Sequence, residues 1–172
     1  MSSQDLVCVH VGTAHFTFFA AERYVRARRG LKQLADLLQH QVLDLALDTS
    51  GQGNIATWAK LTPRNRLLTN MNGALVETVR HGAGVTLLPS FAPLIYPQLV
   101  PVLPSVGLPV SILLCYERET AKRPAVRTTI DYLKDVVFNE RTMPWFRAAY
   151  EPPTKNWAKG FAATMETLYP KA

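Results

Sequence analysis

Cysteine is scarce in this sequence: the chain of 172 residues contains only two, Cys8 and Cys115. Small secreted domains that depend on disulfides carry a denser framework of cysteines, so the sequence does not fit that class. No apolar secretory leader precedes the first predicted strand. We therefore expect free thiols and a cytoplasmic location.

Long apolar runs are also missing, and none approaches the roughly 20 residues that a helix needs to span a bilayer. We therefore expect no membrane partner. The hydrophobic fraction is 48% and the charged fraction is 19%, which are ordinary values for a globular protein and argue against wholesale disorder. The length fits one domain with a substantial buried core.

The sequence offers no convincing set of metal ligands or nucleophiles. Cys8 and His10 lie two positions apart on one predicted strand, with His15 nearby, whereas a zinc site needs paired ligands on two elements. A Cys–His nucleophile pair needs direct contact, but alternate positions on a strand lie roughly 6–7 Å apart. We expect a buried cysteine beside a hydrogen-bonded histidine, with no metal and no cofactor.

Phosphate-binding and acid–base motifs are missing as well. Gly82 and Gly84 follow a predicted helix, whereas the glycines of a dinucleotide fold follow a strand. Gly51 and Gly53 lie in a polar loop with no Lys-Ser or Lys-Thr to complete a P-loop. The acidic residues show no pairing that suggests proton transfer. The sequence therefore predicts no catalytic residues and no enzyme activity.

The formal net charge of +6 raises the question of nucleic-acid binding. The basic residues are scattered, however, and helical spacing spreads the densest group around a helix instead of along one stripe. No aromatic residues interleave with them as they do on RNA-binding surfaces. A solvated basic helix face is therefore favoured over direct binding. The densest group comprises Arg23, Arg26, Arg28, Arg29 and Lys32.

The most informative stretch covers residues 70–89, NMNGALVETVRHGAGVTLLP. Asn70 and Asn72 are good N-cap residues for a helix, and Gly82 suits the left-handed position after its end. A buried strand, Val85–Leu88, follows and stops at proline. The start of such a helix attracts anions, because its free N–H groups and its dipole point the same way. The alternative is an ordinary helix–strand unit without a ligand.

Strands alternate with helices along the rest of the chain, which predicts an α/β sheet with parallel pairs. Gly12 and Thr13 are expected to turn the chain between the first two strands. Aromatic residues in the tail from Glu140 predict a segment that wraps the domain or a partner. Predicted strands are Leu6–Val11, His15–Ala20, Val42–Leu47, Arg66–Thr69, Val85–Leu88, Val100–Leu103 and Val110–Tyr116, and predicted helices are Glu22–Arg29, Gln33–Leu38, a short one ending near Tyr96, and Pro124–Phe138.

An ordered series of segments resembles the effector-binding domain of LysR-type transcriptional regulators. The resemblance covers roughly Leu6 to Pro153, and the order of the segments is more specific than any one of them. The segments are FFAAERYV (18–25), LADLLQHQVL (34–43), HGAGVTLLPSF (81–91), LVPVLP (99–104), ILLCY (112–116) and RPAVRTTIDYLKDVV (123–137), followed by PWFRAAYEPP (144–153), which is similar to a C-terminal extension in one branch of the family.

The resemblance implies an α/β fold like that of periplasmic binding proteins, with two lobes joined by two crossing strands near Thr17–Phe19 and Leu113–Tyr116. The second lobe, about residues 17–115, is expected to be nearly complete. The first lobe is expected to be a remnant, about residues 6–12 and 123–138, within a partial domain 1–139. Residues 140–172 form an aromatic-rich extension. The family's DNA-binding helix-turn-helix is expected to be absent, as in a truncated protein.

The resemblance also implies a site for a small organic anion or carboxylate effector, between the helix start and the turn after strand Val85–Leu88. Met71 and Phe91 would pack the apolar body of the ligand, in a cleft that lacks half of its wall. DNA would be reached only through the absent helix-turn-helix. The expected effector-binding residues are Thr69, Asn70, Met71, Asn72, Pro89, Ser90 and Phe91.

The function implied by the resemblance is that of a small-molecule sensor domain of a LysR-type regulator. Self-association into a homodimer is expected, because strand Leu6–Val11 would lie beside vacant positions and expose its edge. Two alternatives remain open. One is an interaction remnant that pairs with regulators and senses nothing, and the other is a small α/β enzyme of unrecognised chemistry.

Overall fold

The computed structural model describes residues 5–28, 30–46, 65–139 and 143–153. The loop expected at Asp48–Asn54 and most of the aromatic tail lie outside these residues. The elements are β1 (Leu6–Ala21), α1 (Glu22–Ala27), the 3₁₀ helix η2 (Leu34–Gln39), β2 (Gln41–Leu45), β3 (Asn65–Thr69), α3 (Asn72–Arg80), β4 (Val85–Pro89), α4 (Ala92–Ile95), β5 (Leu99–Pro101), β6 (Leu108–Glu117), the 3₁₀ helix η3 (Thr120–Lys122), α5 (Pro124–Tyr132), the π turn η4 (Leu133–Val137) and the 3₁₀ helix η5 (Pro144–Phe146).

All six strands belong to one mixed sheet, in the order β3-β2-β4-β1-β5, with β6 also paired to β1. β2 runs parallel to β3 and β4. β1 runs antiparallel to β4, β5 and β6. This arrangement confirms the predicted α/β fold with parallel pairs.

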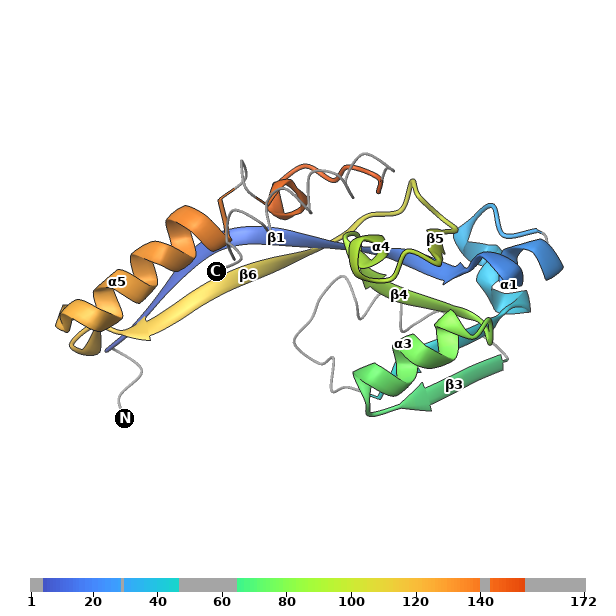
Figure 1. Ribbon diagram of the computed structural model, residues 1–172, viewed down its shortest axis with the longest axis horizontal. Helices are drawn as coiled ribbons and strands as arrows, with labels where there is room; N and C mark the ends of the chain where they lie inside the picture. Colours follow the sequence, from blue (N-terminus) through green and yellow to red (C-terminus); the bar gives the residue numbers. More distant parts are fainter. Residues whose placement is uncertain (1–4, 29, 47–64, 140–142, 154–172) are drawn as a thin grey trace, which may run out of the picture.

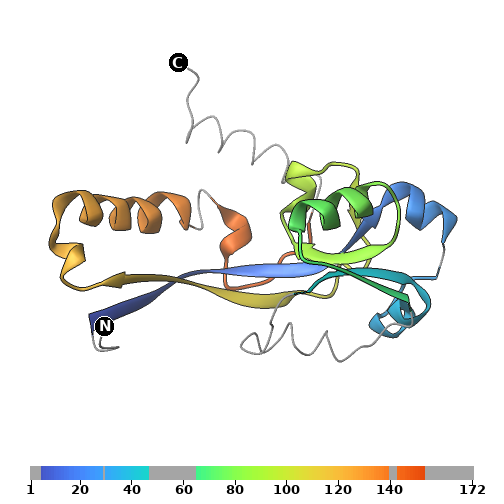
Figure 2. The same ribbon diagram turned by 90° about the horizontal axis from the view of Figure 1, so that it is seen from below.

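The molecule has a compact end and a narrow end (Figure 1). The compact end contains β2 to β5 with α1, α3 and α4. At the narrow end β1 and β6 continue as a two-stranded ribbon, formed by residues 6–14 of β1 with 110–117 of β6. Helix α5 runs along this ribbon, and Figure 2 shows α3 and α5 on the same side of the sheet.

The predicted turn at Gly12 and Thr13 is wrong, because β1 is a single strand of 16 residues. Its ladder with β6 continues across this point with a register shift between His10 and Gly12. A β-bulge therefore absorbs the extra residue. Glycine suits this position for another reason: a Cβ atom on Gly12 would lie 3.3 Å from the Cβ of Phe146, which is a tight contact.

The expectation of free thiols is also wrong. Cys8 and Cys115 occupy opposite positions in the β1–β6 ladder, with their Cα atoms 4.1 Å apart, and they form a disulfide. Cys8 is exposed instead of buried, whereas His10 does make a hydrogen-bond contact, with the Thr13 hydroxyl at 3.3 Å. The bond links the two strands of the ribbon covalently.

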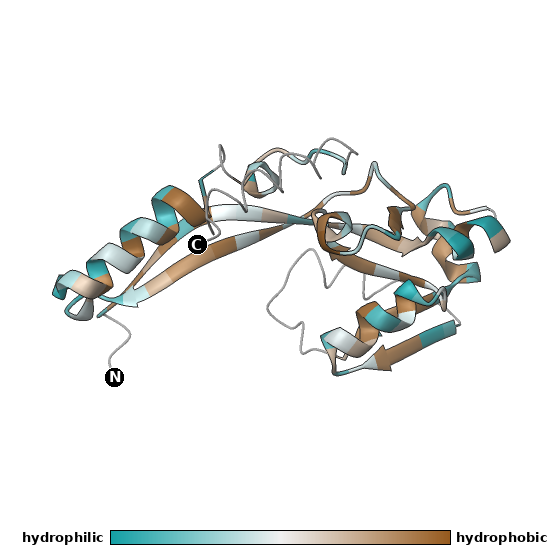
Figure 3. Ribbon diagram, in the orientation of Figure 1, coloured by the Kyte–Doolittle hydropathy of each residue, from teal (hydrophilic) through white to brown (hydrophobic). Residues whose placement is uncertain are grey.

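The core lies in the compact end and covers both faces of the sheet. Phe18 and Phe19 are both fully buried, and they belong to different hydrophobic clusters because successive side chains of a strand point to opposite faces. The cluster around Phe18 includes residues of α1 and η2, and the cluster around Phe19 includes α3 and α4. Figure 3 shows hydrophobic residues along the strands at this end.

The helix–strand unit from α3 to β4 forms as predicted. Leu75, Val76 and Val79 are the buried face of α3, and Gly82 follows the helix end with a φ of +71°. The tight approach comes at Gly84, where a Cβ atom would collide with the Gln41 carbonyl oxygen. β2 can therefore pack against β4 only because position 84 has no side chain.

The predicted helix from Pro124 also forms, with Ile130 buried and the last turn wound as η4. The segment predicted as a helix at Gln33–Leu38 is instead the 3₁₀ helix η2. None of the helices within the described ranges is long and apolar enough to cross a membrane.

Candidate functional site

A pocket of ≈ 490 Å³ lies where β2 and β4 end and α3 begins. This volume is within the range typical of small-molecule sites. The carboxyl ends of parallel strands meet at one sheet edge, which is where α/β proteins usually bind ligands. The pocket is lined by Phe16, Asp44, Leu45, Asn72, Leu75, Val76, Leu87, Leu88, Pro89, Phe91, Ala92, Ile95, Tyr96 and Val110.

Most of this lining is apolar, and its polar members have defined partners or positions. The Asp44 carboxylate accepts a hydrogen bond from the Arg66 guanidinium at 2.5 Å and another from the Leu45 N–H at 2.8 Å. Asn72 is the first residue of α3 and is exposed. The negative charge on the wall is therefore already paired, while the exposed amide at the helix start is available to a ligand.

The predicted effector residues divide into two groups. Asn72, Pro89 and Phe91 line the pocket, but Thr69, Asn70, Met71 and Ser90 are not part of its lining. The Thr69 hydroxyl accepts the Met71 N–H at 3.2 Å, and the Met71 side chain is 64% exposed. Ser90 is buried, and its N–H donates to the His15 carbonyl at 2.7 Å, which fastens the turn after β4 to β1.

The predicted asparagine caps are not formed. The N-cap of α3 is Met71, and no side chain caps the helix. The Met71 carbonyl accepts the Leu75 N–H at 3.0 Å, as the N-cap carbonyl of a helix that starts at Asn72 does. The Thr69 turn redirects the chain here and places Asn70 before the cap position. The first N–H groups of α3 therefore have no side-chain cap.

Sequence reasoning missed most of the pocket walls. Phe16 on β1 and Val110 on β6 reach the pocket because these strands pair side by side near it. Ile95 and Tyr96 come from α4 and the residue after it, and Tyr96 also lies under the Arg80 guanidinium at 5.6 Å. Of these residues, only Ile95 and Tyr96 were indicated by the sequence, because a short helix was expected after Pro89.

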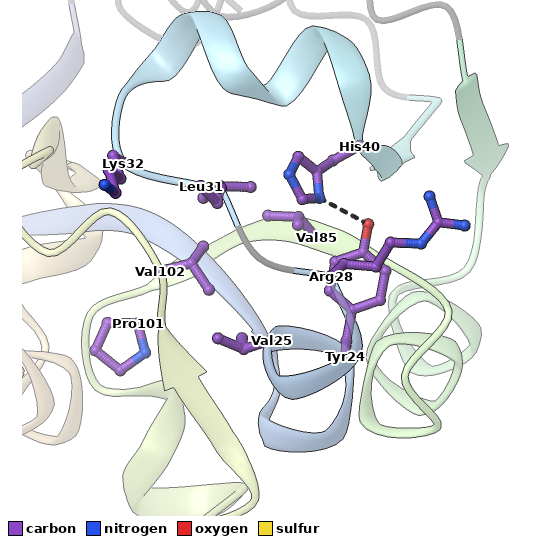
Figure 4. Close-up of a pocket in the computed structure, with 10 residues that line it drawn as sticks. Tyr24, Val25, Arg28, Leu31, Lys32, His40, Val85, Pro101 and Val102 are labelled. Carbon is purple, nitrogen blue, oxygen red and sulfur yellow. Dashed lines mark hydrogen bonds between the residues drawn. The ribbon is translucent and has the colours of Figure 1, made fainter.

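A second, smaller pocket of ≈ 280 Å³ lies between α1, the segment leading to η2, and β5 (Figure 4). The Tyr24 hydroxyl and the His40 Nδ1 are 3.1 Å apart, and the hydroxyl also accepts the Gln41 N–H at 3.3 Å. Burial raises the pKa of Tyr24, although the Gln41 hydrogen bond and the Arg28 charge oppose part of this rise. Burial and the Arg28 charge both lower the pKa of His40. A neutral His40 thus joins α1 to the start of β2, and this explains the histidine of the LADLLQH segment structurally.

No group of three or more possible metal-binding side chains from His, Cys, Asp or Glu occurs among the residues described. The histidine and cysteine of the β1–β6 ribbon, Cys8 and His10, both lie on its exposed side. The pairing of Cys8 with Cys115 removes its sulfur from the set of possible ligands.

The fold and pocket define a class of protein: an α/β domain with a ligand-sized pocket at the edge of a mixed sheet. The sequence matches the LysR substrate binding domain over residues 2–137. The chain belongs to this family. Its members are effector-binding domains of transcriptional regulators, which are not enzymes, and they share a fold with periplasmic binding proteins.

Solved structures agree on the fold. The regulatory domain of AphB from Vibrio vulnificus has a TM-score of 0.58 and 22% identity, with 81% of this chain and 71% of that chain covered. The regulatory domain of CrgA from Neisseria meningitidis has a TM-score of 0.59 and 20% identity, with 78% and 70% covered. The effector domain of AmpR from Pseudomonas aeruginosa has a TM-score of 0.58 and 17% identity, with 78% and 66% covered. A comparison with curated proteins gave no match.

Two buried histidines predict a loss of stability in mild acid. Burial lowers the pKa of both His15 and His40 from the ordinary value of about 6.5. The unfolded chain therefore takes up protons on these histidines more readily than the folded chain does. The free energy of unfolding should be highest above about pH 6.5 and should fall as the pH drops below that value. Denaturant unfolding between pH 5 and 8 measures this, and the combined His15→Asn and His40→Asn variant should show a smaller slope. An unchanged slope would contradict the assignment.

Proposed function

We propose that this chain is the sensing part of a LysR-type regulator and that its ligand occupies the ≈ 490 Å³ pocket at the start of α3. Family membership supports an effector-binding domain. The observation that carries the sensing proposal is the meeting of Asn72, Pro89 and Phe91 in one ligand-sized pocket. We also infer that the compact end is the nearly complete second lobe and that the ribbon with α5 is a remnant of the first.

The proposed effector is a small organic anion, such as a carboxylate, with an apolar and preferably aromatic body. The apolar walls and the Phe91 ring suit such a body. The start of α3 suits the anionic group, because its N–H groups lack a side-chain cap and lie at the positive end of the helix dipole. The Arg66 guanidinium neutralises Asp44, which would otherwise repel the anion. Thr69, Asn70 and Met71 precede α3 outside the pocket lining, and the Ser90 N–H holds the turn after β4 to β1.

A fluorescent aromatic anion, 1-anilinonaphthalene-8-sulfonate, tests this proposal. Asn72→Asp places a negative charge on the pocket wall and should weaken probe binding about tenfold, which corresponds to about 1.4 kcal/mol. Asn70→Asp makes the same change two residues earlier, outside the lining, and should weaken binding less than threefold. Fluorescence titration measures both. Equal affinities for the two variants and the wild type would place the probe elsewhere and contradict the site.

Self-association is a second proposal, and the ribbon supports it. Family regulators oligomerise. Among the described residues, the outer edge of β6 pairs with no strand, and Leu6 and Leu113 are each 58% exposed. The first part of the aromatic tail packs on β1, where Phe146 lies next to Gly12, and Met143 and Trp145 are buried within the chain itself. We therefore infer that two copies meet through their ribbons.

Sedimentation velocity at several concentrations tests this dimer. Leu113→Lys adds a charge to the exposed face of the ribbon and should shift the equilibrium toward monomer by at least tenfold in concentration. Leu68→Lys is the matched control, because Leu68 on β3 is 52% exposed but lies away from the ribbon. A monomer at all concentrations in the wild type, or an equal effect of both variants, would refute the ribbon interface.

A further inference from the structure

The segment after α5 crosses the sheet and touches both ends of the molecule. We call residues 143–150 the aromatic strap. In Figure 1 and Figure 2 it lies over β1 and β6, between α5 and the α3–α4 region. Met143 and Trp145 are buried, so the strap is packed against the domain over this length.

One half of the strap is fixed to the point where β1 enters the compact end. The Tyr150 hydroxyl donates to the Pro104 carbonyl at 2.8 Å, and its ring lies 5.4 Å from the ring of His15. Position 107 must be glycine, because a Cβ atom there would collide with the Tyr150 ring. This half of the strap therefore docks in a site formed by β1 and by the loop between β5 and β6.

The other half of the strap packs on a wall of the effector pocket. The ring centroids of Trp145 and Phe91 are 6.3 Å apart, and those of Phe146 and Phe91 are 5.9 Å apart in an edge-on arrangement. Phe146 also contacts Phe138 at 5.4 Å, just beyond η4. Phe91 lines the pocket, whereas Trp145 and Phe146 are not part of the lining. The strap therefore contacts Phe91 through residues that do not themselves line the pocket.

We propose that Trp145 and Phe146 are positioning residues that hold the Phe91 ring and thereby determine which effectors the pocket accepts. The inference rests on the proposed function, because it assigns specificity to the same pocket. Aromatic rings prefer edge-on or offset arrangements over a face-to-face stack, so Trp145 and Phe146 favour one orientation of the Phe91 ring. With Phe91 fixed, the pocket favours flat aromatic bodies over bulky aliphatic ones.

The arrangement has a thermodynamic consequence. A ligand that packs on Phe91 favours the ring orientation that the strap holds, so ligand binding and strap docking stabilise each other. The same coupling free energy must appear in both measurements. Saturating ligand should therefore protect the strap from proteolysis by the factor by which complete undocking of the strap weakens ligand binding.

The experiment reads Phe91 directly, by fluorine NMR of the full chain labelled with 4-fluorophenylalanine. The chain has seven phenylalanines, and the Phe91→Leu variant identifies the resonance of interest. Trp145→Leu should shift and broaden the Phe91 resonance and weaken binding of 1-anilinonaphthalene-8-sulfonate at least fivefold. Trp145→Phe, which keeps an aromatic ring, should restore most of both. If Trp145→Leu does not fold, Phe146→Leu provides the same test.

The control is Ile130→Ala, which removes a buried side chain on α5 and should leave the Phe91 resonance unchanged. An unchanged Phe91 resonance in the folded strap variants would overturn the proposal whether or not the probe binds. A shifted resonance with unaltered probe affinity would overturn the role in specificity. A wild-type chain that binds no probe would refute the proposed function and the specificity role, whereas the resonance would still report the position of Phe91.

Discussion

The antiparallel pairing of β1 is the constraint on which the rest of the structure depends. This strand pairs with β4 on one edge and with β6 and then β5 on the other, so it connects the compact end to the ribbon. The pairing places Phe18 and Phe19 in the two hydrophobic clusters and brings Phe16 to the pocket. The Ser90 bond to the His15 carbonyl attaches the pocket turn to the same strand.

Local patterns predicted the part of the fold that local interactions determine. The α3–β4 unit formed because its apolar spacing, Gly82 and Gly84 all favour the same geometry. The caps failed because the Thr69 hydroxyl takes the Met71 N–H and moves Asn70 out of the cap position. Gly12 looked like a turn residue, but its lack of a side chain serves the passage of Phe146 above it. The reason for glycine at position 12 is therefore a contact with a segment far away in the sequence, which local sequence patterns do not reveal.

The candidate site was predictable only where its residues follow one another in the chain. Asn72, Pro89 and Phe91 came from the helix–strand unit, which also carries the resemblance to the family. Phe16, Asp44 and Val110 come from three other strands, and their approach depends on strand order that the sequence does not state. The disulfide between Cys8 and Cys115 was missed for the same reason, because its cysteines lie 107 positions apart and only the register brings them together.

The proposed effector site predicts that the pocket at the start of α3 holds an aromatic anion. A crystal structure of the chain soaked with benzoate tests it most directly, because it locates the ligand without assumptions about affinity. The benzoate carboxylate should lie at the first N–H groups of α3, with its ring against Phe91. Benzoate bound elsewhere, with the pocket empty and the start of α3 covered by packed side chains, would contradict it.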